Sequence, residues 1–398
     1  MSRSLYASLT SPLLALGLLL SSSAFAHTPP TTTWLSEPRA GITPWLTAIA
    51  HAHRIDVNEY LLTDSRLITA LRTAAARGAT VNILIDGRPY DDASAVTTTE
   101  TAFRGSRVHL RLAPPRFTGA YAYDHAKYWI FFNSQTTQAS AIFGSPNGTA
   151  SAFNGTNAED ALTTTNSAIL HALTTVFTAD WSHHLAGAAP RHTLVLSPGA
   201  QPALVHLLQS PGPLAIVTEE LGDAPAIYQA FRATHRSVQL LVPATLSASD
   251  RAEAARLIHA GVVIRTLTSP YVHAKLIVTA HAVFVGSQNF SEPSLDSNRE
   301  VGLITSNGSI HTQALAWFHS LWLHAVPWTP STPAPSPTPY LPNGDTPAQV
   351  RAAWGSPTTI LHNTYDGHPQ TVWVYPAGRV DFQSGQVTDV QRSASSHP

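Results

Sequence analysis

The segments His125-Ala126-Lys127-Tyr128-Trp129-Ile130 and His273-Ala274-Lys275-Leu276-Ile277-Val278 are two copies of one pattern, a His-x-Lys triplet that leads into an apolar run. The chain has 398 residues, with 23 lysines and arginines together and 20 histidines. Lys127 and Lys275 are its only lysines, and each stands two residues after a histidine. Random placement would give both coincidences with a chance on the order of 1 in 400. The two triplets therefore decide how the rest of the sequence is interpreted.

Two further short motifs follow each triplet in the same order. The first is Gly144-Ser145-Pro146-Asn147 in one copy and Gly286-Ser287-Gln288-Asn289 in the other. The second is Asn157-Ala158-Glu159 or Asn298-Arg299-Glu300. Residues two apart on a strand face the same side, so the His and Lys of each triplet point together. The Ser and Asn of each Gly-Ser-x-Asn segment have the same spacing, which lets both face a common ligand.

These residue types suit chemistry at a phosphodiester. We expect Glu159 and Glu300 each to accept the second ring N–H of the histidine in its own copy, which fixes the tautomer and raises imidazole basicity. Two such sets, related by a pseudo-twofold axis, present two imidazoles and two ammonium groups to one phosphate. One imidazole can attack phosphorus, while the other protonates the leaving oxygen and then activates water. The lysines, with Asn147 and Asn289, bind the oxygens where charge accumulates, and no metal is then needed.

The motifs belong to an internal repeat of roughly 140 residues, which is typical of a domain duplication. The first copy opens with a strand at 55–60, a helix capped by Asp64 and a buried strand at 81–85. The second copy repeats this order, with strands expected at 214–217, 238–242 and 262–264. Strands that alternate with helices predict an α/β fold with mostly parallel sheets, buried on both faces. The expected fold class is two pseudo-twofold-related α/β sandwich domains and a small C-terminal α+β module.

Composition divides the chain into five parts. Residues 1–26 have the features of a signal peptide: the single charge of Arg3, an apolar stretch, and Ala24-x-Ala26 as a cleavage site. An uncleaved anchor helix is the alternative, but the apolar run is short for a bilayer span. The remaining parts are a first domain at 35–190, a second domain at 191–325, a proline-rich linker at 326–343 and a small module at 344–392.

Charge is scarce in this sequence. Only 12% of residues are charged and the formal net charge is -1, so no global field draws the protein to nucleic acid or anionic lipid. A hydrophobic content of 43% predicts a globular protein. The chain has no cysteine, which excludes disulfides and thiolate chemistry. We expect a monomer in the periplasm or outside the cell, without an integral membrane segment in the mature chain.

The paired motifs resemble the phospholipase D superfamily, which is defined by a duplicated H-x-K-x4-D with Gly-Ser-x-Asn and a downstream Glu. The resemblance covers about residues 35–325 and implies two α/β domains with the active site between them, no metal or other cofactor, and a covalent phosphohistidine. Carried over by position, His125 is expected to be the nucleophile and His273 the general acid. Phosphate would be bound by Lys127, Lys275, Asn147 and Asn289, supported by Ser145 and Ser287, with Glu159 and Glu300 orienting the histidines.

The sequence departs from this family in one respect. The Asp of the family motif falls at Phe132 in the first copy and at Ala280 in the second. In the family that Asp is structural and does not touch substrate, so its loss weakens the motif match more than the chemistry. Residues 344–392 are weakly similar to the small lipoprotein domain of the outer-membrane assembly machinery, which implies a contact with a cell-envelope protein; a capping domain without activity is the alternative.

Four functions fit these observations. The first is an exported phospholipase D-like hydrolase that releases a phospholipid head group, and the second is a secreted nuclease that uses the same site on DNA or RNA. The third is a phosphatidyl transferase of the cardiolipin or phosphatidylserine synthase kind, and the fourth is an inactive binding module. The near-neutral charge disfavours a non-specific nuclease. Two complete sets of His, Lys, Asn and Glu disfavour an inactive module, so the lipid hydrolase is preferred.

Two other groups of residues are weaker candidates. Arg104, Arg107, Arg111 and Arg116 precede the first triplet and could line a groove for an anionic substrate, although a solvated strand edge explains them equally well. The segment Asp180-Trp181-Ser182-His183-His184 could bind a metal, but exposed histidines at a helix end are the preferred interpretation.

Overall fold

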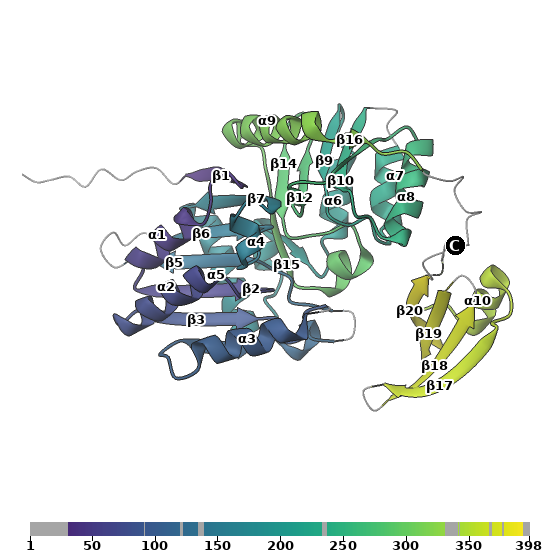
Figure 1. The fold of residues 1–398 in the computed structure, drawn as a ribbon, viewed down its shortest axis with the longest axis horizontal. Helices are drawn as coiled ribbons and strands as arrows, with labels where there is room; N and C mark the ends of the chain where they lie inside the picture. The colour runs from purple at the N-terminus through teal and green to yellow at the C-terminus, as the bar shows by residue number, and fades with distance from the viewer. Residues whose placement is uncertain are drawn as a thin grey trace, which may run out of the picture.

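The computed structural model describes residues 31–90, 92–119, 122–133, 139–232, 237–330, 341, 343–365, 368–375 and 378–392. They form two large α/β domains and a small C-terminal module (Figure 1). The predicted signal peptide at 1–26 lies outside the described residues. Within the described ranges, no helix combines the length and hydropathy that a membrane crossing requires.

The first domain is built on a sheet with the strand order β1-β7-β6-β5-β2-β3-β4. Its strands are β1 Thr32–Glu37, β2 Arg54–Glu59, β3 Thr80–Ile85, β4 His109–Leu112, β5 Tyr128–Phe132, β6 Ala139–Gly144 and β7 Asn157–Thr164. Its helices are α1 Thr43–His51, α2 Ser65–Ala76, α3 Ala93–Phe103, α4 Ala150–Phe153 and α5 Ser167–Trp181. Asp64 caps α2 as predicted, accepting from the backbone N–H groups of Arg66 and Leu67.

The second domain repeats this plan with the strand order β16-β11-β10-β9-β13-β14-β15-β8. Its strands are β8 Val195–Ser197, β9 Leu214–Val217, β10 Val238–Pro243, β11 Val263–Leu267, β13 Leu276–Val278, β14 Val283–Gly286, β15 Glu300–Thr305 and β16 Val326–Pro327. Its helices are α6 Gln201–Leu208, α7 Pro225–Arg232, α8 Ala248–His259 and α9 Gly308–His324. One further short strand, β12 Tyr271–Val272, pairs with β7 of the first domain.

The prediction of mostly parallel sheets is wrong. In each domain only two pairs of the main strand path are parallel, β2/β3 and β3/β4 in the first and β9/β10 and β10/β11 in the second. The strands that carry the motifs are antiparallel neighbours. The connections between them, residues 133–138 and 279–282, are too short for the crossover that a parallel pair requires.

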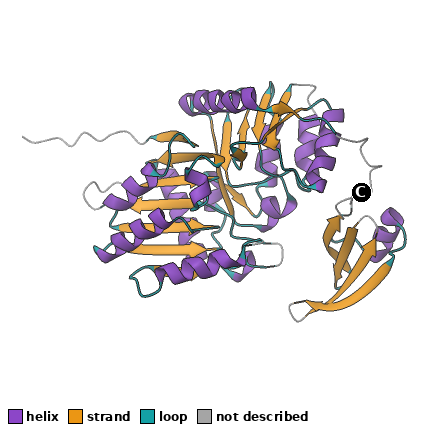
Figure 2. Ribbon diagram, in the orientation of Figure 1, coloured by secondary structure: helices purple, strands orange, loops and turns teal. Residues whose placement is uncertain are grey.

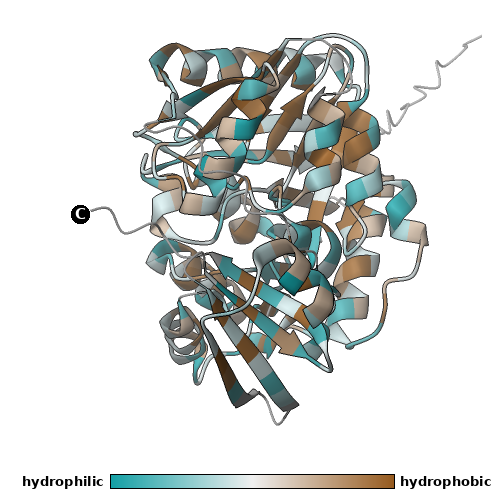
Figure 3. Cartoon of the chain, turned by 90° about the vertical axis from the view of Figure 1, so that its right-hand side faces the viewer, coloured by the Kyte–Doolittle hydropathy of each residue, from teal (hydrophilic) through white to brown (hydrophobic). Residues whose placement is uncertain are grey.

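Both faces of each sheet are buried, as predicted, and the layers explain why. Along β5, Tyr128 and Ile130 join the central apolar cluster, whereas Trp129 and Phe131 join the cluster under α1 and α2. The central cluster takes side chains from α5, α9 and both large sheets, so it joins the two domains into one body. A third cluster lies under α6, α7 and α8. Figure 2 shows this arrangement of helices and strands, and the strands of the second domain, at the top of Figure 3, are mostly hydrophobic.

The C-terminal boundary differs from the prediction. Residues 326–328, assigned to the linker from sequence, continue the second domain: β16 pairs with β11, and the N–H of Trp328 donates to the carbonyl of Ile264. The predicted small α+β module is present. It consists of α10 Pro347–Trp354 and the antiparallel strands β17 Thr359–Tyr365, β18 His368–Tyr375, β19 Gly378–Gln383 and β20 Gln386–Arg392. Its own apolar core, which includes Val350 and Trp373, makes it a separate unit.

Candidate active site

The two His-x-Lys triplets lie at corresponding places in the two domains, each leading directly into a central strand. Lys127 immediately precedes β5 and Lys275 immediately precedes β13. Both lysine side chains are almost fully buried, and the two histidines are only slightly exposed. Ionisable groups at such depth need partners, because burial of an unpaired charge is costly. The structure supplies these partners across the domain boundary.

The backbone around each triplet pairs with the Asn-x-Glu segment of the other domain. The strand β12, just before His273, runs parallel to the start of β7, and the N–H of His273 donates to the carbonyl of Ala158 at 3.1 Å. In the mirrored position Asp124 forms a parallel bridge with Arg299, and the N–H of His125 donates to the Arg299 carbonyl at 2.9 Å. The two copies therefore exchange strands at the pseudo-twofold axis.

The glutamates follow this exchange, and the prediction that each serves the histidine of its own copy is wrong. Nδ1 of His125 lies 2.9 Å from Oε2 of Glu300. Nδ1 of His273 lies 2.7 Å from Oε2 of Glu159. A carboxylate accepts only, so Nδ1 of each ring carries hydrogen and Nε2 is left for chemistry.

Each glutamate is held by further donors. Glu159 accepts from the hydroxyl of Ser145 at 2.6 Å and from Nδ2 of Asn157 at 2.9 Å. Glu300 accepts from the hydroxyl of Ser294 at 2.7 Å and from Nδ2 of Asn298 at 3.1 Å. Burial works against ionisation of both carboxyls, but the bound histidine, a nearby lysine and a serine hydroxyl together outweigh burial, so the pKa of Glu159 and that of Glu300 are lowered.

The glycine of each Gly-Ser-x-Asn segment is needed for close approach of the glutamate-bearing strand. Gly144 has φ +158°, and a Cβ there would lie 2.6 Å from the Cα of Ala161 in β7. A Cβ on Gly286 would lie 2.8 Å from the Cα of Gly302 in β15. Real side chains do not tolerate such distances, so any larger residue would push the strand, and the glutamate at its start, out of place.

The asparagines of the same segments carry polar atoms without a protein partner. Oδ1 of Asn147 and Oδ1 of Asn289 are buried and accept no hydrogen bond from the described residues. Buried polar atoms are normally satisfied, so an unpaired one at the same position in both domains indicates a ligand contact. The amide can turn either its oxygen or its NH2 group toward that ligand.

The charges of the two lysines influence the ionisation of His125 and of each other. Nζ of Lys127 donates to the carbonyl of His125 at 2.5 Å and lies 5.1 Å from the ring centre of Tyr60. Burial lowers the pKa of Lys127 to about 8, opposed by Glu300 and assisted by the charge of Lys275. Burial also lowers the pKa of His125 to about 4, against Glu300 and with help from both lysines. His125 is therefore neutral at pH 7, which leaves a lone pair on Nε2.

Comparison with known proteins agrees with this geometry. The family model described as "Cardiolipin synthase, PLD-like domain" matches residues 46–181 and 209–322, which is more than half of the chain and includes both triplets. The chain belongs to the phospholipase D superfamily. No curated protein sequence matches this superfamily member.

Two solved structures show the same fold at low sequence identity, those of a phosphatidylserine synthase and a polyphosphate kinase. Phosphatidylserine synthase from Haemophilus influenzae Rd KW20 is 11% identical with a TM-score of 0.59, over 75% of this chain and 87% of its own. Polyphosphate kinase from Porphyromonas gingivalis is 15% identical with a TM-score of 0.55, over 73% of this chain; the match spans 50% of the kinase. The phospholipase D family member Nuc from Salmonella typhimurium is 17% identical with a TM-score of 0.31, over 34% of this chain and 95% of its own.

The residues at which this phospholipase D-like chain lacks the family aspartate lie away from the site. Phe132 is five residues beyond Lys127 on an extended strand, which at about 3.3 Å per residue places it roughly 16 Å further along. Its ring packs under the guanidinium of Arg54. Ala280 has the same offset from Lys275 and lies in the turn after β13. Neither replacement removes one of the His, Lys, Asn or Glu side chains of the two motif sets.

The serines of the family motif occupy a different role from the predicted phosphate contact. The hydroxyl of Ser145 donates to Glu159, and that of Ser287 accepts from the backbone N–H of Val301. Both serines are completely buried behind the glutamate-bearing strand. Their contacts support the strand and the carboxylate.

Sequence reasoning missed two residues that contact the catalytic groups. Tyr60 follows β2 and its ring centre is 4.7 Å from that of His125. Glu219 follows β9, and its Oε2 lies 2.7 Å from Nζ of Lys275 and 3.5 Å from Nε2 of His273. Both lie outside the motifs. Their position in the sequence could have found them, because each lies one or two residues after the buried strand that pairs with its His-x-Lys strand.

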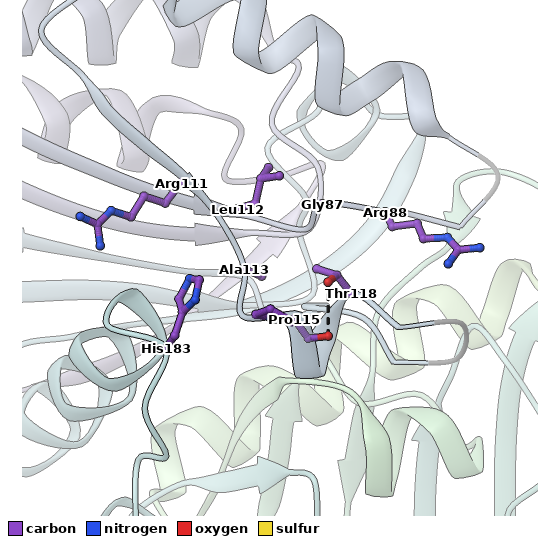
Figure 4. Close-up of a pocket in the computed structure, with 8 residues that line it drawn as sticks. All are labelled: Gly87, Arg88, Arg111, Leu112, Ala113, Pro115, Thr118 and His183. Atoms are coloured by element: carbon purple, nitrogen blue, oxygen red, sulfur yellow. Dashed lines mark hydrogen bonds between the residues drawn. The ribbon is translucent and has the colours of Figure 1, made fainter. Parts of the chain in front are cut away.

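The remaining candidates are exposed or bind other partners: Arg104, Arg107 and Arg111 are exposed. Asp180 binds the guanidinium groups of Arg116 and Arg299, and His183 and His184 are exposed, as preferred from the sequence. A cavity of about 630 Å³ lies beside Arg111; its lining is Gly87, Arg88, Arg111, Leu112, Ala113, Pro115, Thr118 and His183. In Figure 4 Arg88 and Arg111 extend from it in opposite directions, so these cations do not converge on one anion.

Proposed function

We propose that this chain is an exported phosphodiesterase of the phospholipase D type that hydrolyses the head-group bond of a phospholipid through a covalent phosphohistidine. The observation that carries the proposal is the crossed pair of buried His–Glu contacts, with a lysine beside each histidine. We infer that the two Nε2 atoms and the two ammonium groups face one substrate phosphate; the charge of Lys275 acts on both His125 and Lys127, which supports this. A phosphodiester is the substrate class that uses all four groups.

In the first step His125 acts on phosphorus. Its neutral Nε2 attacks, a P–N bond forms, and the P–O bond to the leaving alcohol breaks as His273 donates its Nε2 proton to that oxygen. Positive charge then develops on the phosphorylated imidazole, and the Glu300 carboxylate at Nδ1 stabilises it. Lys127 and Lys275 neutralise the non-bridging oxygens, and Asn147 and Asn289 donate hydrogen bonds to them.

In the second step the roles reverse. The neutral His273 takes a proton from water, the water oxygen attacks phosphorus, and the P–N bond breaks to restore His125. The products are a phosphate monoester and the alcohol released before. Glu159 holds the ring of His273 in one tautomer through both proton transfers.

Phospholipid is preferred over nucleic acid because the surroundings of the site are poor in cations. Among the described residues the acidic groups Glu219, Glu220 and Asp250 gather on the second-domain side, and burial with Asp250 and Glu219 raises the pKa of Glu220 to about 7. A polyanion gains affinity by neutralising several phosphates with Lys and Arg. A chain with a net charge of -1 offers no excess of Lys and Arg for several phosphates. A single head-group phosphate needs only Lys127 and Lys275.

Transfer to an alcohol is the second candidate. The matching family model is described as cardiolipin synthase, and the fold is similar to that of a phosphatidylserine synthase. Such a transferase shares the first step and replaces water by an alcohol in the second. The ratio of hydrolysis to transfer therefore depends on access of each nucleophile to His273.

Export, the absence of a cofactor requirement and the monomeric state belong to the same proposal. The signal-peptide features of residues 1–26 support export to the periplasm or the medium. One chain holds both halves of the site, so activity requires no second copy. The family match ends at residue 322, and the cell-envelope contact of residues 344–392 stays a prediction.

A side-by-side assay tests the proposal. The purified mature protein is incubated with phosphatidylcholine vesicles, with the same vesicles plus a primary alcohol, and with single-stranded DNA. Head-group release without DNA cleavage is the expected result, and an alcohol-dependent phosphatidyl product would identify a transferase. DNA cleavage without head-group release would overturn the lipid assignment, and no product in any arm would overturn the phosphodiesterase assignment.

A further inference from the structure

The two halves of the site carry different residues at a structurally equivalent position beside the histidines. In the first domain Asn58 of β2 pairs with Tyr128, and in the second Val217 of β9 pairs with Leu276. Tyr128 and Leu276 each directly follow a His-x-Lys triplet, so the two pairs correspond. Two residues further along, the first domain has Tyr60 and the second has Glu219.

Tyr60 gives the first histidine a neutral neighbour. Its ring meets that of His125 edge to face, and the Lys127 ammonium lies over the same ring. The Tyr60 hydroxyl accepts from the backbone N–H of Tyr90 at 2.6 Å. Burial raises the pKa of the Tyr60 phenol, so it adds no negative charge near His125.

Glu219 gives the second histidine a charged neighbour. The same carboxylate oxygen, Oε2, lies 3.5 Å from Nε2 of His273 and 2.7 Å from Nζ of Lys275. Its other oxygen accepts from the hydroxyl of Tyr271 at 3.1 Å, which fixes the side chain. Burial opposes ionisation of Glu219, but His273 and Lys275 outweigh it and hold the pKa of its carboxyl far below the usual range.

The remaining charged groups do not cancel this difference. Glu159 faces Nδ1 of His273 just as Glu300 faces Nδ1 of His125, and each histidine has a lysine two residues on. His273 thus has carboxylates at both ring nitrogens, Glu159 from β7 and Glu219 from the end of β9. A proton on Nε2 of His273 therefore has an ionic partner that the same proton on His125 does not have.

We propose that Glu219 is the positioning residue that makes the two histidines unequal: it keeps the Nε2 proton on His273, which becomes the general acid, and so leaves His125 as the nucleophile. This inference rests on the proposed phosphodiesterase activity and assigns a residue outside the family motifs. Glu219 acts through His273. Replacement of Glu219 should therefore slow the reaction most when the leaving oxygen needs a proton from His273.

The test compares wild type with Glu219→Gln on two phosphodiesters, one with a choline leaving group and one with a p-nitrophenol leaving group. Choline is a poor leaving group and requires the general acid, whereas p-nitrophenolate leaves without a proton. We expect E219Q to lose at least about tenfold in the first step on the choline ester and less than about threefold on the nitrophenyl ester.

Tyr60→Phe is the matched control at the corresponding position of the first domain. It retains the ring against His125, so the ratio of the two substrates should stay at the wild-type value. Equal losses of E219Q on both substrates would refute the inference, because a disturbed Lys275 or a distorted site slows both. If wild type cleaves neither ester, the proposed function fails rather than the role of Glu219.

Discussion

Replacement of Glu300 by glutamine should slow formation of the phosphohistidine. Oε2 of Glu300 lies 2.9 Å from Nδ1 of His125 in a buried site, and the imidazole gains positive charge as it attacks phosphorus. A hydrogen bond to a charged group contributes about 1.5–3 kcal/mol, against about 0.5–1.5 kcal/mol for a neutral one. Glutamine retains the shape and an acceptor oxygen but not the charge. A loss of roughly 1–2.5 kcal/mol corresponds to about a 5- to 70-fold slower step.

A single-turnover experiment measures this step. Enzyme in excess is mixed with a p-nitrophenyl phosphodiester, and release of nitrophenolate is followed together with acid-quenched phosphohistidine. E300Q should slow nitrophenolate release and phosphohistidine formation equally, because residue 300 is hydrogen-bonded to His125 and both signals report the attack of His125 on phosphorus. The unfolding temperatures of wild type and variant should agree within a few degrees, because the side chains are isosteric.

The mirrored variant Glu159→Gln is the control, since Glu159 binds His273. With a leaving group that needs no proton, E159Q should slow the first step little and slow hydrolysis of the phosphohistidine instead. If E159Q suppresses nitrophenolate release while E300Q does not, either the crossed pairing or the choice of His125 as nucleophile is incorrect.

Four further predictions follow from the site. His125→Ala and His273→Ala should each abolish steady-state turnover of a phosphatidylcholine substrate, but only the His273 variant should retain phosphohistidine formation from the nitrophenyl ester. EDTA treatment should leave turnover unchanged, because imidazoles and ammonium groups supply the charge and the proton transfers; strong inhibition would refute the metal-free mechanism. The pH profile should rise as pH increases through about 4, where His125 becomes neutral, and fall above about 8 as Lys127 loses its charge; an acid limb near 6.5 would contradict the buried, neutral His125. Gly144→Ala should destabilise the protein by about 1–3 kcal/mol in denaturant unfolding, whereas Gly119→Ala, with open space around it, should be neutral within about 0.5 kcal/mol; equal behaviour of the two would refute the close approach of β7.

Local sequence patterns predicted the site well where they depend on spacing along one strand. The placement of Lys127 and Lys275 at the start of two central strands follows from the apolar runs after each triplet. The duplication follows from the order of the motifs. The strand directions were predicted wrongly because the alternation of strands and helices before each triplet was taken to set the direction of the whole sheet, whereas the short connections at 133–138 and 279–282 allow only hairpins.

The partners of the histidines could not be predicted in the same way. Glu159 has the same sequence offset from His125 whether it contacts that residue or His273, so spacing cannot separate a crossed pair from an uncrossed one. The crossed pairing follows from contacts between the domains: β12 pairs with β7 of the first domain, and Asp124 pairs with Arg299 of the second. Glu219 is separated from His273 by α7, β10, α8, β11 and β12 and belongs to no motif, so its contact depends on the pairing of β9 with β13.

The exchange of segments has a consequence for how such a site can change over time. Two separate copies of one half could assemble the same crossed contacts, but any substitution would then be placed beside both histidines at once. Covalent linkage of the halves removes that constraint. A tyrosine can stand beside one imidazole and a carboxylate beside the other, so the acid and the nucleophile can be adjusted independently. The cost is that neither half retains a complete histidine pair if the chain is cut between the domains.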